Sequence, residues 1–269
     1  MPNLSDFSSA KPIKMLLIGD SGKGKTGALA SLAEAGLQVR ILDFDNGLSI
    51  LPSILKGKPE AIARIQYESC LDDFHMVGQK LLPKGVPTAF TKGLSLMTDW
   101  KTPSLNLGPV SSWDKKNVLV IDSLSHLSNA AMRYVLSLNK RSGEQPWQSD
   151  WGQAMSLIEQ VLQLLYSDQI KCHVILTAHI THIGGEENAD GKMVGVKQYP
   201  NTLGQKLPPK IPQYFNTMLQ CDTLPITNKR IIRTVPNSDL GLKCEILGMP
   251  KELPLESGLA DFFRAAGQL

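Results

Sequence analysis

Short apolar runs alternate with polar, glycine-containing turns along this chain, and the spacing predicts an α/β protein. Runs bounded by polar residues are typical of strands covered on both faces of a sheet, and four are found: 13–18, 38–44, 117–122 and 173–179. Stretches with helical spacing lie at 26–35, 125–138 and 152–166. Strands that alternate with helices favour a central, mostly parallel sheet flanked by helices.

Other parts of the chain give weaker patterns. Residues 61–68 are predicted as a further strand and residues 70–82 as a short helix. Residues 83–116 are rich in Pro, Gly, Ser and Thr, which predicts an insertion or long connection, with a hairpin around residues 94–100.

The pattern predicts one folded domain. A chain of 269 residues is long enough to build one sizeable α/β core, and it contains no internal repeat. The polar, Ser-rich residues 1–11 are expected to be a frayed tail, and residues 12–269 the domain. Short antiparallel strands with turns are expected at 215–247, and a closing helical turn at 261–266.

Composition narrows the class of protein. Hydrophobic residues make up 42% and charged residues 20%, as in soluble globular proteins. The net charge of +3 is too small to indicate a nucleic-acid partner, although a local basic face would suffice. No apolar run approaches the roughly 18 residues of a membrane span. The four scattered cysteines form no C-x-x-C motif, so free thiols in a reducing cytoplasm are expected.

The turn between the first strand and the first helix carries the most specific chemical signal. It matches the phosphate loop G-x-x-x-x-G-K-[ST], in the strand–loop–helix context that this motif requires. The residues expected to contact the nucleotide are Gly19, Asp20, Ser21, Gly22, Lys23, Gly24, Lys25 and Thr26. Backbone N–H groups would surround the β-phosphate, Lys25 would pair with β- and γ-phosphate oxygens, and the Thr26 hydroxyl would bind Mg²⁺. The motif predicts a bound nucleoside triphosphate.

A second motif is typical of a magnesium-binding strand end. The apolar residues 118–121 end in Asp122, whose carboxylate would hold Mg²⁺ opposite Thr26, directly or through water. The alternative is that Asp122 caps the following helix. No N-K-x-D motif is present, so a GTPase is not expected.

Two aspartates follow the second predicted strand. Asp43 and Asp45 are two residues apart, so both carboxylates could point toward the γ-phosphate, where an acid can align and deprotonate the attacking water. The alternative is a polar turn whose bend is made by Asn46 and Gly47.

These motifs together resemble RecA-type recombinases. Residues 42–48, L-D-F-D-N-G-L, are similar to the segment that carries the catalytic glutamate of the family, which implies that Asp45 is the catalytic base, one methylene shorter. Residues 118–124 are similar to its Walker B strand. Residues 174–180, V-I-L-T-A-H-I, resemble the strand whose last polar residue senses the γ-phosphate. That residue is usually glutamine, and here it is His179, as also occurs in DnaB-like helicases.

The matches occur in the family's order between residues 13 and 180, which implies a RecA-like core with ATP and Mg²⁺. Within the family, the chain resembles compact phage ATPases that act in single-strand annealing or recombination. That resemblance implies a phage-encoded ATPase in the bacterial cytoplasm, stimulated by DNA. It would bind single-stranded DNA, assemble into a filament or ring, and have a single-strand DNA-binding protein as a further partner.

His179 has two other interpretations. With His182 it could bind a metal ion, but no Cys, His or Asp partner stands at a suitable spacing. It could also be a polar strand-end residue without a sensing role.

Two loops are predicted to bind DNA on the nucleotide side of the sheet. The first, 139–151, contains Lys140, Arg141, Trp147 and Trp151. The second, 181–212, is long and without predicted structure, and contains Lys192, Lys197 and Lys206. Lysine and arginine pair with phosphates, and tryptophan stacks on unpaired bases. The alternative is two solvated loops whose tryptophans fold into the core.

Late basic residues suggest a contribution to a neighbouring subunit. Lys229, Arg230 or Arg233, with Lys243 as an alternative, could reach the neighbour's γ-phosphate. Two other functions remain open. One is a ring-forming helicase or translocase. The other is a small-molecule kinase whose arginine-bearing lid and acceptor pocket would lie in residues 83–116.

Overall fold

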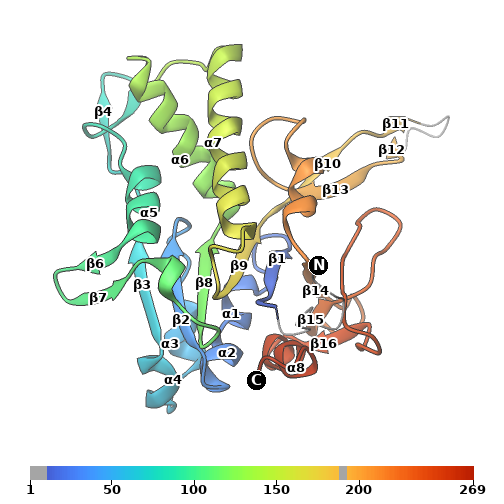
Figure 1. Cartoon of the computed structure of the whole chain (residues 1–269). Helices are drawn as coiled ribbons and strands as arrows, with labels where there is room; N and C mark the ends of the chain where they lie inside the picture. The colour runs from blue at the N-terminus through green and yellow to red at the C-terminus, as the bar shows by residue number, and fades with distance from the viewer. Residues whose placement is uncertain (1–10, 188–192) are drawn as a thin grey trace, which may run out of the picture.

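An eight-stranded sheet forms the centre of the protein in this computed structural model, which describes residues 11–187 and 193–269 (Figure 1). Its order is β16-β15-β14-β1-β9-β8-β2-β3, and the six strands from β14 to β3 are parallel. β15 and β16 continue the sheet in antiparallel fashion. The strands are β1 (Lys14–Ile18), β2 (Gln38–Asp43), β3 (Ile65–Ser69), β8 (Asn117–Asp122), β9 (His173–Ala178), β14 (Thr217–Thr223), β15 (Arg230–Arg233) and β16 (Glu252–Pro254). The predicted parallel sheet with a short antiparallel extension is confirmed.

Helices cover both faces of the sheet, because alternate residues of each buried strand point to opposite sides. On β1, Leu16 and Ile18 join one hydrophobic core, and Met15 and Leu17 join the other. The first core is covered by α5 (Ala89–Thr98), α6 (Leu124–Leu138) and α7 (Gln148–Tyr166). The second is covered by α1 (Lys25–Ala28), α2 (Ala30–Glu34), α3 (Ile50–Ile54), α4 (Pro59–Ala63) and α8 (Gly258–Ala265).

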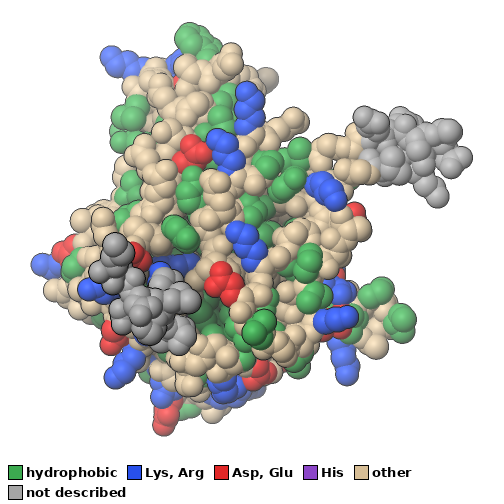
Figure 2. Space-filling model, turned by 45° about the vertical axis from the view of Figure 1, so that its right-hand side comes forward, with side chains coloured by type: hydrophobic (Ala, Val, Ile, Leu, Met, Phe, Trp, Pro, Cys, Tyr) green, Lys and Arg blue, Asp and Glu red, His purple; other side chains and the backbone are tan. Residues whose placement is uncertain are grey.

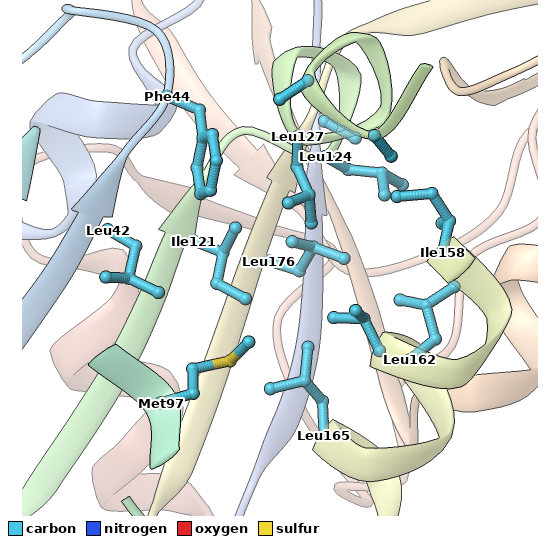
Figure 3. Close-up of a cluster of buried hydrophobic side chains, with 14 of the residues drawn as sticks. Leu42, Phe44, Met97, Ile121, Leu124, Leu127, Ile158, Leu162, Leu165 and Leu176 are labelled. Atoms are coloured by element: carbon cyan, nitrogen blue, oxygen red, sulfur yellow. The ribbon is translucent and has the colours of Figure 1, made fainter. Parts of the chain in front are cut away.

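The first core fixes the position of α6. Figure 3 shows Ile121 of β8 and Leu176 of β9 facing Leu124 and Leu127, the side chains of the first turns of α6. All four residues are buried. Each buried leucine contributes about 1.5–3 kcal/mol by removal from water, so the start of α6 is held firmly at the carboxyl end of β8.

Most predicted helices are found near the expected positions. α6, α7 and α8 confirm the helices predicted at 125–138, 152–166 and 261–266. The helix predicted at 26–35 is present as α1 and α2, which meet at Leu29. The strand predicted at 61–68 begins later, because α4 occupies its first residues.

The helix predicted at 70–82 is wrong. The segment forms an antiparallel hairpin of β4 (Phe74–Val77) and β5 (Lys80–Pro83). Gly78 adopts a φ of 60° in the two-residue turn, a conformation that favours hairpins and ends helices. The residues of β4 are all exposed, so no apolar helix face would have been buried there.

The hairpin predicted around 94–100 is also wrong, because most of that range belongs to α5. Phe90, Leu96 and Met97 of α5 are buried at helical spacing against the first core. The hairpin comes later, as β6 (Trp100–Thr102) and β7 (Leu105–Gly108), followed by the 3₁₀ turn η2 (Val110–Ser112).

The described residues of the predicted structureless loop at 181–212, which are 181–187 and 193–212, include paired strands that form an arm. β10 (Ile180–Ile183) pairs with β13 (Lys197–Pro200), and β11 (Glu186–Glu187) pairs with β12 (Met193–Val194). Figure 1 shows this arm extending from the carboxyl end of β9. The 3₁₀ helix η3 (Pro208–Tyr214) follows it. Alternation along these strands is concealed by glycine and charged residues, which explains why the sequence pattern did not reveal it.

The four cysteines are unpaired, which confirms the expected free thiols. Along the described part of the chain, no helix combines the length and the apolarity needed to cross a bilayer.

A buried histidine makes the fold sensitive to acid. His173 is fully buried, its Nδ1 accepts the Ile13 N–H at 3.0 Å, and its ring packs edge-on against Phe263. Burial, with smaller contributions from the nearby Lys115 and Lys14, lowers the pKa of His173 to about 4. The neutral ring is therefore the form that the folded protein accepts.

We expect the free energy of unfolding to fall as the pH falls from about 6.5 to about 4, because the unfolded chain binds a proton at His173 first. The loss from this group at pH 5 is on the order of 2 kcal/mol. Urea denaturation at pH 7.5 and pH 5 measures it. His173→Gln should reduce the pH difference, and His75→Gln, at an exposed position, should not. An equal pH difference in the His173→Gln protein contradicts the assignment.

Candidate functional site

The predicted site residues gather at the carboxyl ends of four neighbouring strands. The sheet order β1-β9-β8-β2 places the phosphate loop after β1, His179 after β9, Asp122 at the end of β8 and Asp45 after β2. Parallel strands deliver their carboxyl ends to the same edge, which is where ligands bind in open α/β sheets.

The phosphate loop has the backbone shape of an anion cradle. Gly22 and Gly24 have φ values of 77° and 93°, which are accessible to glycine at no steric cost. The Gly19 N–H donates to the Ala178 carbonyl at 3.2 Å, which ties the loop to the end of β9. A chain that turns through such conformations presents successive N–H groups toward one concave side.

Lys25 closes this loop. Its ammonium donates to the carbonyls of Gly19 at 2.7 Å and Asp20 at 3.1 Å, and its Nζ lies 3.4 Å from His179 Nδ1. The residue is buried, and this burial lowers its pKa, an effect that the nearby acidic groups oppose. Phosphate oxygens in this position would replace the carbonyls with charged acceptors.

Thr26 and Asp122, the two residues predicted to hold Mg²⁺, are in direct contact. The Thr26 hydroxyl donates to Asp122 Oδ2 at 2.7 Å, and the Thr177 hydroxyl donates to Asp122 Oδ1. Asp122 is buried, and this burial raises its pKa. A hydroxyl and a carboxylate are hard oxygen donors that fit Mg²⁺. The helix-cap alternative does not match, because Ser123 is the N-cap of α6 and no side-chain cap bond is formed.

Asp43 and Asp45 have different environments. Asp43 is buried, and its Oδ1 accepts the N–H groups of Asp45 at 3.1 Å and Asn46 at 2.8 Å. Asn46 has a φ of 56°, so the polar-turn interpretation applies to Asp43. Asp45 lies within this turn, but its carboxylate points to the other site residues.

Three side chains contact the Asp45 carboxylate. Oδ1 accepts hydrogen bonds from the Ser123 hydroxyl at 2.7 Å and from His126 Nδ1, and Oδ2 lies 3.4 Å from His179 Nε2. Burial opposes ionisation of Asp45, but these hydrogen bonds outweigh it and hold the pKa of Asp45 well below its usual range. The hydrogen bond between His126 and Asp45 also raises the pKa of His126.

His126 is a site residue that the sequence patterns did not reveal. It lies in the first turn of α6, four residues after Asp122, and that turn faces the carboxyl edge of the sheet. Its position shortly after the strand end that is predicted to bind magnesium is the signal that could have identified it.

His179 lies between the phosphate loop and Asp45. Besides the contacts with Lys25 and Asp45, its N–H donates to Ser125 Oγ at 3.3 Å and its carbonyl accepts the Asn201 N–H at 2.7 Å. β10 begins at the next residue, so the site and the arm share one segment. Among the described residues, His182 is absent from the one group that could hold a metal ion, so a pair with His179 has no support.

The first predicted DNA loop is separated from the strand ends by a whole helix. It follows α6 rather than a strand, and the 15 residues of that helix place it about 22 Å from the strand ends. Arg141 pairs with Asp150 and lies 3.9 Å from the Trp147 ring centre, so its charge is already neutralised. Trp147 is 65% exposed and Trp151 36%, so the alternative that the tryptophans fold into the core is wrong. Lys140 is exposed, with a φ of 57°.

The second predicted DNA region adjoins the site. Lys197 lies on β13, and its ammonium donates to the Ser238 carbonyl at 2.6 Å while the residue stays exposed. Lys206 is exposed in the segment before η3. Lys192 lies outside the described residues. Figure 2 shows Lys and Arg side chains scattered among acidic and hydrophobic ones on the face drawn, with no single basic patch among its described residues.

The late basic residues divide into two groups. Arg233 pairs with Asp222 and Glu252, and the Lys243 ammonium donates to the Pro212 carbonyl at 2.6 Å. Lys229 and Arg230 are exposed. Two of the four candidates for a contact with a neighbouring subunit therefore have structural roles within this chain.

Comparison with known families gives one match: the model of the AAA_24 family, described as an AAA domain, matches residues 11–241. This match and the strand order confirm the predicted RecA-like P-loop core. No curated protein sequence matches significantly.

Similar solved structures include a RadB recombinase, with 14% identity, a TM-score of 0.44, and coverage of 91% of this chain and 89% of the other. A KaiC-like protein, PH0186 from Pyrococcus horikoshii OT3, has 14% identity, a TM-score of 0.42 and coverage of 90% and 84%. The flagellar accessory protein FlaH from Methanocaldococcus jannaschii has 12% identity, a TM-score of 0.41 and coverage of 95% and 93%.

A substitution of Gly19, the first residue of the phosphate loop, tests how closely the loop packs against β14. A Cβ on Gly19 would lie 2.6 Å from the Cys221 carbonyl oxygen, a backbone atom that cannot move freely. We expect Gly19→Ala to lower the free energy of unfolding by about 1–3 kcal/mol and to weaken nucleotide binding. Gly152→Ala is the matched control, because that position in α7 is open. Chemical denaturation and a fluorescent ATP analogue measure both effects. Wild-type stability and affinity in Gly19→Ala would show that the packing is not tight.

Proposed function

The chain belongs to the AAA_24 family of AAA domains, and on this basis we propose that it is an ATPase that binds single-stranded DNA and promotes strand annealing or recombination. One observation carries the proposal. His179 contacts both the phosphate-loop lysine and Asp45, and the next residue begins the arm. A nucleotide at the phosphate loop and a DNA strand on the arm would therefore both influence the His179 side chain.

The chemistry follows from the charges at the site. Loop N–H groups and Lys25 would bind the β- and γ-phosphates, and Thr26 with Asp122 would hold Mg²⁺. When bound, Mg²⁺ supplies positive charge at the phosphate oxygens. Asp45 would orient the attacking water and accept its proton.

Asp45 is a poor proton acceptor while its present contacts persist. The hydrogen bonds from Ser123, His126 and His179 stabilise its ionised form and use both of its oxygens. Release of at least one contact would raise its basicity. A γ-phosphate that attracts His179 would do so, and we infer that hydrolysis is slow until DNA and nucleotide are both bound.

The DNA surface in this proposal is the arm and the segment that follows it. Lys197 on β13 and Lys206 before η3 supply positive charge to this surface, and Lys192, which belongs to the same proposal, lies outside the described residues. The loop at the far end of α6 contains Lys140, Trp147 and Trp151. A DNA strand would reach these residues only along a second surface. Assembly into a filament or ring, with Lys229 or Arg230 reaching a neighbour's nucleotide, belongs to the same proposal. So do a phage origin and a single-strand DNA-binding protein as a partner.

The kinase alternative has no feature in its favour. Residues 83–116 contain no arginine, and they bury Phe90, Trp100 and Trp113 in the first core. The helicase alternative differs from the proposal in its assay result, because strand separation and strand annealing are opposite outcomes with complementary oligonucleotides.

Substitutions at the phosphate end of the site separate binding from turnover. We expect Lys25→Ala to abolish ATP binding, because it removes the point charge on the β- and γ-phosphates. Asp45→Asn should keep ATP binding and lose at least 100-fold in turnover, because an amide cannot accept the proton (about 10²–10⁴ for general-base catalysis). Asp122→Asn should raise the Mg²⁺ concentration needed for activity. Phosphate release measures turnover, and wild-type turnover in Asp45→Asn would contradict its role.

His179 tests the coupling of the two ligands. We expect His179→Ala to bind ATP nearly normally but to lose the effect of ATP on DNA affinity, and equally the effect of DNA on ATP affinity. Anisotropy of a labelled oligonucleotide, with and without a non-hydrolysable ATP analogue, gives the ratio of affinities. A ratio equal to that of the wild type would refute the sensor role.

Salt dependence tests the arm as a DNA surface. The logarithm of affinity should fall with the logarithm of salt concentration by about 0.7 per phosphate contacted. Lys197→Ala and Lys206→Ala should each reduce that slope by about one contact. Lys56→Ala is the control, because this lysine is exposed between α3 and α4 and belongs to neither predicted DNA loop. Trp147→Ala or Trp151→Ala should cost about 1–3 kcal/mol without a change of slope if a base stacks there. A protein without residues 184–206 that keeps full affinity would place the DNA site elsewhere.

A further inference from the structure

Three potential metal ligands meet beside the phosphate loop. Asp45, His126 and His179 come from the turn after β2, the first turn of α6 and the end of β9. Their ligand atoms all lie within 4.8 Å of one another, and this is the one group of His, Cys, Asp and Glu found to do so in the described residues. The group is separate from the Thr26–Asp122 pair, which supplies only oxygen donors.

We propose that Asp45, His126 and His179 bind one divalent transition-metal ion of the zinc class. Two imidazoles with one carboxylate suit Zn²⁺, Co²⁺ or Ni²⁺, whereas Mg²⁺ prefers oxygen ligands alone. This site is therefore chemically distinct from the magnesium pair, although both lie at the same edge of the sheet.

The geometry is close to that of a metal site. Tetrahedral zinc with bonds of about 2.0–2.1 Å needs ligand atoms about 3.3 Å apart. His179 Nε2 lies 3.4 Å from Asp45 Oδ2, and His126 Nδ1 contacts Oδ1. The two rings have centres 6.2 Å apart and are inclined at 71°, so they are not stacked on each other. Small side-chain rotations would complete the set.

The surroundings support binding of an ion. The Ser123 hydroxyl donates to Asp45 Oδ1 at 2.7 Å, which is the kind of second hydrogen bond that orients a ligand carboxylate. The side chain of His126 is 49% exposed and that of His179 is 26% exposed. An ion could therefore enter from solvent and keep water in its fourth position.

Lys25 opposes the ion. Its ammonium lies 3.4 Å from His179 Nδ1, the nitrogen that must carry a proton when Nε2 binds a metal. A like charge and a donor facing a donor both weaken binding. Removal of the ammonium should therefore strengthen binding of the ion, which a purely structural role of the cluster does not predict.

The ion would inhibit the reaction proposed above, and this consequence rests on that proposed function. A metal ion bound to Asp45 would occupy the carboxylate lone pairs that must accept the proton of the attacking water. It would also hold His179 away from a γ-phosphate. Magnesium at Thr26 and Asp122 would not relieve the inhibition, because it binds different atoms.

Calorimetric titration of the nucleotide-free protein with Zn²⁺, and the visible absorbance of bound Co²⁺, test the site without any ATPase assay. We expect one ion per chain, with affinity reduced at least 10-fold in His126→Gln and in His179→Gln. His75→Gln and His182→Gln are the matched controls and should bind like the wild type. Lys25→Ala should bind the ion more tightly. Unchanged binding in both His126→Gln and His179→Gln, or no binding by the wild type, overturns the proposal.

The inhibitory consequence is tested with Mg²⁺–ATP in excess and free Zn²⁺ set by a metal buffer. Zinc should slow hydrolysis by the wild type and by His75→Gln, and a chelator should restore it. The residual activity of His126→Gln should not respond to zinc. Zinc-insensitive wild-type hydrolysis overturns the inhibitory role. If no variant hydrolyses ATP, the proposed function has failed, and the binding titrations alone decide whether the ion site exists.

Discussion

A buried carboxylate, Asp122, is the group on which the arrangement of the site depends. A carboxylate removed from water needs hydrogen-bond donors, and it finds them in Thr26 at the start of α1 and Thr177 of β9. These two hydrogen bonds join the end of the phosphate loop, β8 and β9 at the Asp122 carboxylate. Loss of either donor would leave a buried acceptor without a partner, so the strand order and the position of the loop are coupled.

The same edge of the sheet holds a second carboxylate, that of Asp45, which differs from Asp122 in its exposure and its hydrogen bonds. Asp45 is partly exposed and contacts three side chains, whereas Asp122 is buried and accepts hydrogen bonds from two hydroxyls. Burial therefore dominates the pKa of Asp122, and hydrogen bonding dominates that of Asp45. One acid is suited to holding a cation in place. The other must exchange partners before it can act, and its partners are the two histidines that make a metal site possible.

The position of His179 explains how one fold can combine the two kinds of chemistry. Its ring lies between Lys25 and Asp45, its N–H is bonded to α6, and its carbonyl is bonded to the segment after the arm. Movement of this ring would change its contacts with Lys25 and Asp45. The site and the arm are therefore connected through a few contacts rather than through a large change of fold.

The sequence by itself determined the features that depend on residues close together in the chain. The phosphate loop, the strand that ends at Asp122, the turn around Asp43 to Asn46 and the long helices all follow from local spacing. Local glycine and proline content did not distinguish a loop from the α5 helix or the β10–β13 arm. The helix is ordered by burial of one face against the first core, and the arm by pairing between its two strands.

Only the tertiary structure decided which side chains meet. His126 contacts Asp45 across 81 positions of sequence, and Arg141 is neutralised by Asp150, which is contributed by the next helix. The sequence does not show in which direction α6 leaves the sheet, so it does not show how far the first predicted DNA loop lies from the strand ends. That direction is set by the burial of Leu124 and Leu127 against β8 and β9, a long-range packing preference that no local pattern of residues encodes.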